Sequence, residues 1–346
     1  MNALPAFCAN DRLMVFAPHP DDETLAAGEL IQSARAAGAT VRVVFATDGD
    51  NNPWPQRWLE RRWTVGPADR QRWGARRRRE AAQAMAELGI DSPEALQFLG
   101  LPDQGLTEAL MRDDAALEEL VRSLSSFTPT HLAMPTLADR HPDHSALRVM
   151  LELALLRNES SCIRLGYVVH RVDASASTVL RASAFQQRKQ AAMAAYVSQM
   201  ALSAGRLRAL ASRAEHFEVD GIVANGLAAR HSTLRISRVP DPVLPRRHEL
   251  LVIAAAATQA RRWRVVLPAR SAVEVSGRAP PLTIEPTSDA WLVSLPTLDF
   301  ATSVAFAKIH RTLPRVMIFD RQRWFDTREL PAIVTAELAP ISGDMA

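Results

Sequence analysis

The sequence is poor in cysteine and in long apolar runs, and both absences limit what the chain can be. Its 346 residues include only Cys8 and Cys162, so no disulfide framework is expected, and two free thiols in a reducing compartment are the simpler expectation. No run of about 18 apolar residues occurs, so we expect no membrane-spanning helix. Residues 1–7 lack the basic and apolar regions of a signal peptide. Together these absences predict a cytoplasmic protein.

A glycine-rich turn is also missing where a dinucleotide-binding protein would have one. Residues 13–17 and 41–46 are apolar like buried strands, and residues 24–37 have the apolar spacing of a helix that ends at Gly38. The turn after the first strand carries no G-x-G-x-x-G sequence and presents His and Asp side chains instead. Strands and helices alternate to about residue 220. This pattern predicts an α/β fold with a Rossmann-like, mostly parallel sheet and helices on both faces.

The composition changes near residue 235, where prolines cluster and short β-like runs follow with little helix signal. We therefore predict two domains, an α/β domain over residues 1–225 and a β-rich C-terminal domain or subdomain of unknown role over residues 235–346. Three local features are also predicted: a long loop over residues 50–69, one helix over residues 107–125 and one helix over residues 185–204 that ends at Gly205.

Positive charge is concentrated in one segment. The formal net charge of the chain is only +3, but nine arginines lie between Arg57 and Arg79. Four tryptophans accompany them: Trp54, Trp58, Trp63 and Trp73. Trp and Arg together are favoured at binding surfaces, whereas a solvated helix face is the ordinary explanation of an arginine run. Residues 57–79 therefore either bind a phosphate of the substrate or form a solvated face, and a nucleic-acid partner is not favoured.

Two short segments concentrate His and Asp side chains, and each follows an apolar strand-like run. They are Pro18-His19-Pro20-Asp21-Asp22-Glu23 and His141-Pro142-Asp143-His144. In an open α/β sheet, ligands bind beyond the carboxyl ends of the strands, so two strand ends can bring these side chains to one place. Each segment alone also fits a turn in which an Asp caps the next helix. Both segments together, each after a strand, favour a functional site.

The residue types fit a hydrolytic zinc site, which needs three protein ligands and an open position for water. Three residues can supply the ligands: His19, Asp22 and His144. His141 and Asp21 then remain for proton transfer and charge stabilisation, and Asp143 can hold one imidazole in the right tautomer. The other histidines are scattered without ligand spacing and are expected to be structural or surface residues.

The two segments together resemble the signature motifs of the PIG-L/LmbE-type zinc-dependent N-deacetylases. Shorter matching pieces occur in the expected order: Thr47-Asp48-Gly49, Arg77-x-x-Glu80, Leu101-Pro102-Asp103 and Ser198-Gln199. The resemblance covers about residues 10–220, and the paired motifs are far more specific than the shorter pieces. The C-terminal part has no matching element.

The resemblance implies a hydrolase that removes the acetyl group from an N-acetylated amino sugar and releases acetate. The substrate class would be an N-acetylglucosamine glycoside, a glycolipid or a nucleotide sugar, and the cofactor would be Zn²⁺. The roles it implies are zinc binding by His19, Asp22 and His144, general-base catalysis by Asp21, oxyanion stabilisation or acid catalysis by His141, a hydrogen bond from Asp143 to one histidine, and contacts to sugar hydroxyls from Arg77 and Asp103. Residues 54–79 would form a wall of the substrate site.

Other functions stay open at this point. The same site can act on a different N-acyl substrate, such as an antibiotic or a thiol conjugate, and a non-catalytic member of the family can bind polyanions through the arginine-rich segment. The metal is also open, because mixed His and carboxylate ligands accept Fe(II) or Co(II) as well as Zn(II).

Overall fold

The computed structural model divides the chain into two compact units. One unit comprises Met1–Asp139 and Asp143–Val223, and the other comprises Arg140–Pro142 and Ala224–Ala346. The structure describes these residues: 6–159, 161–170, 178–180, 183–220, 233–237, 248–267, 270–278, 280–287, 290–296, 298, 304–311, 323–326 and 333–335. The interval between the two predicted domains falls largely on residues 221–232, which lie outside this set.

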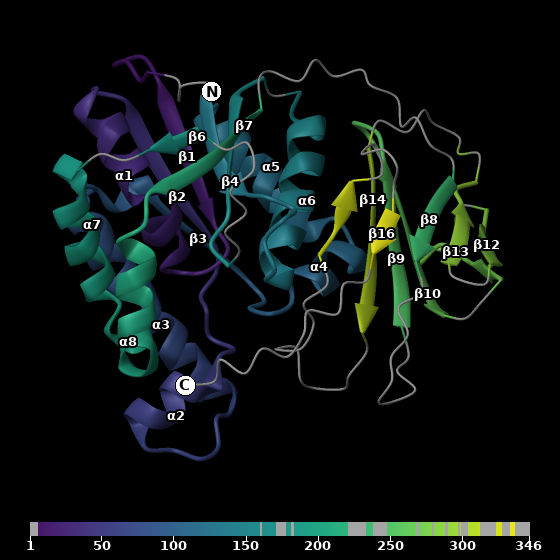
Figure 1. Cartoon of the computed structure of the whole chain (residues 1–346), viewed down its shortest axis with the longest axis horizontal. Helices are drawn as coiled ribbons and strands as arrows, with labels where there is room; N and C mark the ends of the chain where they lie inside the picture. Colours follow the sequence, from purple (N-terminus) through teal and green to yellow (C-terminus); the bar gives the residue numbers. More distant parts are fainter. Residues whose placement is uncertain are drawn as a thin grey trace. The chain divides into compact units, whose positions relative to one another are not determined.

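The first unit is built on a seven-stranded sheet with the order β3-β2-β1-β4-β5-β7-β6 (Figure 1). Its strands are β1 (Arg12–Ala17), β2 (Thr40–Thr47), β3 (Leu96–Leu101), β4 (His131–Pro135), β5 (Ile163–Tyr167), β6 (Thr178–Leu180) and β7 (Glu215–Asp220). The five strands from β3 to β5 pair in parallel, and β7 and β6 complete the sheet in antiparallel pairing. The mostly parallel sheet predicted from the sequence is confirmed.

Among the described residues, this unit has eight α-helices, most of which lie around the sheet (Figure 1). They are α1 (Asp22–Ala36), α2 (Pro53–Glu60), α3 (Pro67–Glu87), α4 (Leu106–Arg112), α5 (Ala115–Phe127), α6 (Pro142–Arg157), α7 (Ser183–Ala195) and α8 (Val197–Ala211), and a short 3-10 helix spans Pro93–Ala95. Among the described residues, no helix is both long and apolar enough to cross a bilayer.

Both faces of the central strands are buried, as the unbroken apolar runs predict for a parallel sheet. On one face, Val15 and Val43 share a hydrophobic cluster with Leu30 of α1, Met85 of α3 and Met193 of α7. Side chains that alternate with them along β1 and β2, such as Met14, Phe16 and Val44, point to the other face and are fully buried as well. Helices therefore cover both faces.

A buried ion pair joins α7 to the last long strand of this sheet. Lys189 Nζ lies 2.7 Å from Glu215 Oε1, and neither side chain is exposed. The Glu215 carboxylate also accepts hydrogen bonds from the backbone N–H groups of Glu29 and Leu30 in α1, at 2.7 and 2.9 Å. The pair therefore ties two helices to one strand.

Replacing Lys189 by methionine is expected to lower the free energy of unfolding by about 3–5 kcal/mol, because the buried carboxylate loses its countercharge. Urea denaturation followed by circular dichroism measures this change. The double variant Lys189→Met/Glu215→Gln, which removes both charges, should recover part of the loss. A single variant within about 1 kcal/mol of the wild type would show that the pair is not needed.

The predicted loop over residues 50–69 is wrong, because α2 occupies its middle. Asn52 caps this helix, its side chain accepting a hydrogen bond from Trp54 N at 3.4 Å, and Pro53 stands at the first helical position. The helix is hard to recognise in the sequence because it has only eight residues and mixes proline, tryptophan and arginine.

Two predicted helices are each divided in two. The first breaks at Asp113, whose backbone is extended and whose carboxylate accepts a hydrogen bond from Ala115 N at 3.0 Å, so that α4 and α5 are separate. The second breaks at Tyr196 between α7 and α8, where the tyrosine hydroxyl donates to Glu23 Oε1 at 2.5 Å. Gly205 lies inside α8 and does not end it.

The second unit is β-rich, as the sequence predicts, with a four-stranded sheet in the order β10-β9-β14-β15 and a five-stranded sheet in the order β11-β12-β13-β8-β16. Its strands are β8 (Thr233–Ser237), β9 (His248–Ala255), β10 (Ala260–Leu267), β11 (Ser271–Ala272), β12 (Leu282–Pro286), β13 (Ala290–Ser294), β14 (Val304–Arg311), β15 (Phe325–Asp326) and β16 (Ile333–Thr335). Residues of both sheets, among them Val252, Trp263 and Ile284, form one hydrophobic cluster.

Candidate metal centre

The candidate site lies at the carboxyl ends of the central parallel strands. The chain runs from β1 to β2 and β3 on one side and then crosses to β4 on the other side of β1. The point where the strand order reverses is where α/β sheets bind their ligands. The first motif follows β1, and the second follows β4 and runs into the first turn of α6.

The first motif forms a tight turn that the neighbouring helix α3 holds in place. Asp21 has a φ of 115°, a conformation that costs energy for any residue with a Cβ. Arg77 of α3 is buried and donates to Gly49 O at 3.0 Å, to Asp21 Oδ2 at 3.2 Å and to the carbonyl of Pro20. The Asp21 N–H donates to Glu23 Oε2 at 3.0 Å. The strained turn is therefore fixed from both of its ends.

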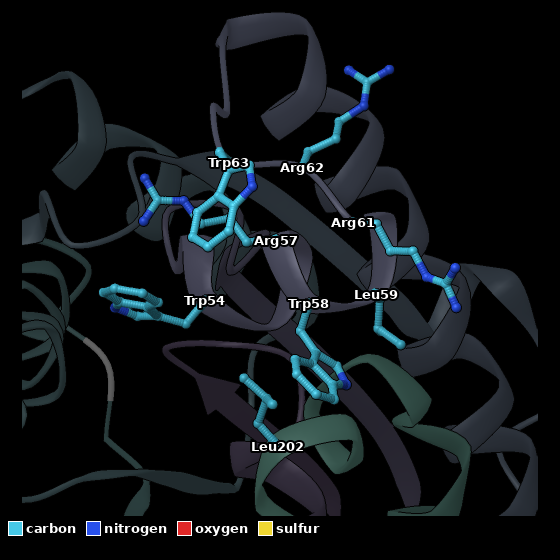
Figure 2. Close-up of a pocket in the computed structure, with 8 residues that line it drawn as sticks. All are labelled: Trp54, Arg57, Trp58, Leu59, Arg61, Arg62, Trp63 and Leu202. Carbon is cyan, nitrogen blue, oxygen red and sulfur yellow. The ribbon is translucent and has the colours of Figure 1, made fainter.

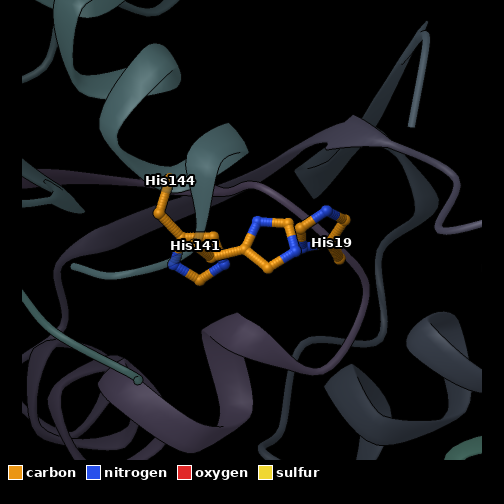
Figure 3. A group of neighbouring side chains, drawn as sticks. All are labelled: His19, His141 and His144. Carbon is orange, nitrogen blue, oxygen red and sulfur yellow. The ribbon is translucent and has the colours of Figure 1, made fainter. Parts of the chain in front are cut away.

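Two imidazoles converge on one carboxylate. His19 Nδ1 and His144 Nε2 each lie 3.1 Å from the same atom, Asp22 Oδ2. The two rings have centroids 5.4 Å apart, and Asp22 and His144 are buried. His141 completes a group in which one ring nitrogen from each of His19, His141 and His144 lies within 4.8 Å of the others (Figure 3).

Further carboxylates orient the two imidazoles from behind. Asp139 Oδ2 lies 3.0 Å from His144 Nδ1 and accepts from the Val169 N–H at 2.8 Å, so it directs His144 Nε2 toward Asp22. His19 Nε2 lies 3.2 Å from Asp103 Oδ1 and 3.3 Å from Asp143 Oδ2, so its Nδ1 also faces Asp22. A carboxylate behind each metal-binding imidazole is the usual arrangement in zinc proteins.

The electrostatics of the site favour a bound cation. Burial alone raises the pKa of Asp22, but His144 and His19 outweigh it and hold that pKa well below the usual value. Burial lowers the pKa of His144, yet Asp139 and Asp22 raise it to about 10. Four buried carboxylates surround the imidazoles of His19 and His144: those of Asp22, Asp103, Asp139 and Asp143. A divalent ion would balance the excess negative charge. The donor set of two imidazole nitrogens and one carboxylate fits zinc.

Asp21 stands beside these donors in a different environment. Burial raises the pKa of its carboxyl to about 7, against the opposing effect of the Arg77 guanidinium. Its Oδ2 accepts from Arg77 at 3.2 Å. A carboxylate so placed next to a metal can take and return a proton near neutral pH.

The remaining predicted site residues lie in the same region. Asp143 is fully buried and accepts from the N–H groups of Gln104 and Leu106, at 2.7 and 3.1 Å, besides facing His19. Asp103 accepts from Asn51 N at 2.6 Å. Arg77 and Asp103, at 4% and 7% exposure, line the interior of the site, and their contacts to sugar hydroxyls stay a prediction.

Sequence reasoning missed two residues of the site. The sequence does not single out Asp139, and it places His170 among the histidines expected to be structural or surface residues. The His170 ring lies 4.9 Å from the His144 ring, and a ring nitrogen of His170 falls within 4.8 Å of donor atoms of Asp22 and His144. Each residue follows the carboxyl end of a strand, β4 or β5, and that position was the only signal available.

Asp139→Asn is expected to weaken metal binding by about 10–100-fold, because the amide no longer fixes the His144 tautomer as a carboxylate does. Competition with a chromophoric chelator measures the affinity. The exposed Asp91→Asn provides a matched control with the same chemical change. Equal metal affinity in Asp139→Asn and the wild type would exclude a positioning role.

Known proteins and a family model match parts of the chain. A family model described as PIG-L, GlcNAc-PI de-N-acetylase, matches residues 14–155. A 1D-myo-inositol 2-acetamido-2-deoxy-alpha-D-glucopyranoside deacetylase from Mycobacterium sp. (strain KMS) is 34% identical over 149 residues, which cover 38% of this chain and 46% of the relative. The enzyme of that name from Mycobacterium avium (strain 104) is 41% identical over 83 residues, 24% of this chain and 26% of the relative. The chain thus spans less than half the length of these curated relatives.

Solved structures align with about three fifths of this chain. GalB, the 4-carboxy-2-hydroxymuconate hydratase from Pseudomonas putida KT2440, aligns over 63% of this chain and all of its own, at 17% identity and a TM-score of 0.50. The N,N'-diacetylchitobiose deacetylase from Pyrococcus horikoshii aligns over 61% of this chain and 84% of its own, at 18% identity and a TM-score of 0.49. At such identities the likeness concerns the fold alone.

The matched segment contains both motifs and the carboxylate behind His144. The curated relatives reported above are named as deacetylases of an acetamido sugar. Residues 14–155 of this chain form a PIG-L family domain.

Proposed function

We propose that the protein is a zinc-dependent N-deacetylase that hydrolyses the acetamide of an N-acetylated amino sugar and releases acetate. The observation that carries this proposal is the convergence of His19 Nδ1 and His144 Nε2 on Asp22 Oδ2, each at 3.1 Å. These atoms offer two nitrogens and one carboxylate to a single ion and leave further positions to water and substrate. The deacetylase names of the relatives support the reaction type.

His19, Asp22 and His144 would hold the ion. When bound, zinc supplies Lewis-acid chemistry, because it polarises an amide carbonyl and lowers the pKa of water. Asp139 behind His144, and Asp103 behind His19, would keep both imidazoles in the orientation that binding requires.

Asp21 would act as the general base. Its turn is fixed by Arg77, so the carboxylate stays beside the donor atoms and can take a proton from the attacking water. The water oxygen bonds to the acetyl carbon, the C–N bond breaks, and the amine leaves with a proton while acetate remains. His141 would stabilise the negative charge on the carbonyl oxygen or give the amine its proton.

The proposed substrate is a glycoside, glycolipid or nucleotide sugar of N-acetylglucosamine, on which the acetamide projects from a sugar ring. Arg77 and Asp103 line the site close to Asp21 and His19, and they are the proposed contacts for sugar hydroxyls. We propose that the enzyme acts in the cytoplasm.

Metal removal tests the proposal directly. Purified protein should contain close to one equivalent of zinc by mass spectrometry and should release acetate from N-acetylglucosamine glycosides. Dialysis against a strong chelator should abolish the release, and zinc should restore it, while magnesium, which prefers oxygen ligands, should not. Stoichiometric zinc without acetate release would move the search to other N-acyl amides. Protein that neither holds nor accepts zinc would contradict the proposal.

A further inference from the structure

The helix α2 and the turn after it expose an unusual set of side chains. We define the tryptophan–arginine patch as Trp54, Arg57, Trp58, Arg61, Arg62 and Trp63. Its three indoles are 58%, 66% and 90% exposed, whereas Trp73, only ten residues further on, is fully buried. Together with Leu59 of α2 and Leu202 of α8, the patch lines a hollow of about 690 Å³ (Figure 2). Such a concentration of exposed indoles marks an interaction surface.

The patch is held by the fold rather than left on a loose loop. Gln56, on the buried side of α2, donates to Asp69 O at 2.8 Å and to Glu60 Oε2 at 3.3 Å, which ties α2 to the beginning of α3. Asn52 caps the helix, and Pro55 is buried. Pro55 and Gln56 are the buried residues of α2, and Trp54 and Trp58 of the same helix are exposed (Figure 2).

The charge of this region is strongly positive. Residues 54–79 contain nine arginines but only two acids, a charge of +7 in a chain whose net charge is +3. Both acids are already paired: Glu60 with Arg72 at 2.5 Å, and Asp69 with Arg62 of the patch and with Arg72 at 2.8 and 3.0 Å.

Two guanidinium groups of the patch stay uncompensated. Among the residues that the structure describes, no carboxylate forms an ion pair with Arg57 or Arg61. Arg57 instead lies over the Trp54 ring at 5.1 Å. Indole rings and unpaired cations therefore share one surface, which suits a partner that is apolar and anionic at once.

We propose that the tryptophan–arginine patch docks the protein on an anionic phospholipid surface. Trp side chains are favoured at the boundary between lipid headgroups and acyl chains, and arginines near that boundary are attracted by anionic headgroups. At 90% exposure, Trp63 is not enclosed in a slot for a single flat ligand, which favours an extended partner. This inference goes beyond the proposed deacetylation and does not depend on it.

Sedimentation with lipid vesicles tests the docking. The wild type should bind vesicles of phosphatidylglycerol and phosphatidylcholine, bind phosphatidylcholine alone much more weakly, and dissociate as salt screens the attraction. Arg57→Gln/Arg61→Gln, which removes the two cations without a carboxylate partner, should weaken binding by about 30-fold. Trp58→Ser/Trp63→Ser should weaken it by at least about 30-fold as well, since the indoles supply the apolar contact. Arg112→Gln/Arg122→Gln, at two other exposed arginines, should bind like the wild type.

Circular dichroism and a thermal transition will show whether each variant is folded before its binding is compared. Folded patch variants that bind vesicles as well as the wild type would overturn the proposal. So would a wild type that ignores vesicles but binds single-stranded DNA at physiological salt, because stacking on Trp and Arg also suits a nucleic acid.

Discussion

Replacing His144 by alanine is expected to remove both the bound zinc and the acetate release. The variant loses one of three proposed ligands, so its metal affinity should fall by more than the roughly 10–100-fold typical of residues behind the ligands. Metal content by mass spectrometry and acetate release measured on the same samples provide the readout. His216→Ala, which removes an exposed histidine from β7 of the same unit, is the matched control.

The loss must be separated from unfolding. His144 is buried between Asp22 and Asp139, so its removal leaves Asp139 without an imidazole and Asp22 with His19 alone. Asp22→Asn, which keeps the shape of the side chain but removes the ligand charge, should also lose the metal and provides a second variant. Stoichiometric zinc in folded samples of both variants would contradict the proposed ligand set.

The sequence predicted the part of the site that is compact along the chain. His19 and Asp22 lie within five residues of the end of β1, and His144 lies in the first turn of α6. The end of a strand or the beginning of a helix next to each motif was therefore enough to predict where these residues lie. The carboxyl ends of parallel strands lie at the same edge of the sheet, which explains why the two motifs meet although they are more than a hundred residues apart in the sequence.

The unpredicted part depends on tertiary contacts. Asp139 becomes significant only because its carboxylate meets His144 Nδ1, and His170 only because β5 lies beside β4. Neither contact leaves a periodic or local trace in the sequence. The Arg77-x-x-Glu80 piece singles out Arg77 from a run of four arginines, but its contacts to Gly49 and Asp21 are visible only in the structure.

The helix boundaries predicted from the sequence were wrong for a related reason. The break between α7 and α8 lies at Tyr196, whose hydroxyl donates a hydrogen bond to Glu23 of the first motif. Ser198, two residues later, donates its backbone N–H to Glu80 of α3 at 3.0 Å. These contacts outweigh the helical propensity of the surrounding alanine-rich sequence, so propensity alone predicts one continuous helix. The helix is divided where it supports the site.

Asp21→Asn is the variant that separates catalysis from metal binding. The asparagine side chain has nearly the same shape and can still accept a hydrogen bond from Arg77, so the strained turn and the metal content should be preserved. It cannot take a proton from water, and kcat should therefore fall by roughly 10²- to 10⁴-fold.

Steady-state acetate release, together with zinc content, measures this effect. Asp48→Asn is a useful control, because Asp48 is bound to an arginine of α3 in a similar way, with 2.8 and 2.7 Å contacts to Arg78. It should change kcat far less, since Asp48 has no assigned proton-transfer role. A fully metallated Asp21→Asn enzyme that retains wild-type kcat would assign the base to another residue, with His141 the next candidate. Loss of zinc from the variant would instead mean that Asp21 contributes to metal binding, which the convergence of donor atoms on Asp22 argues against.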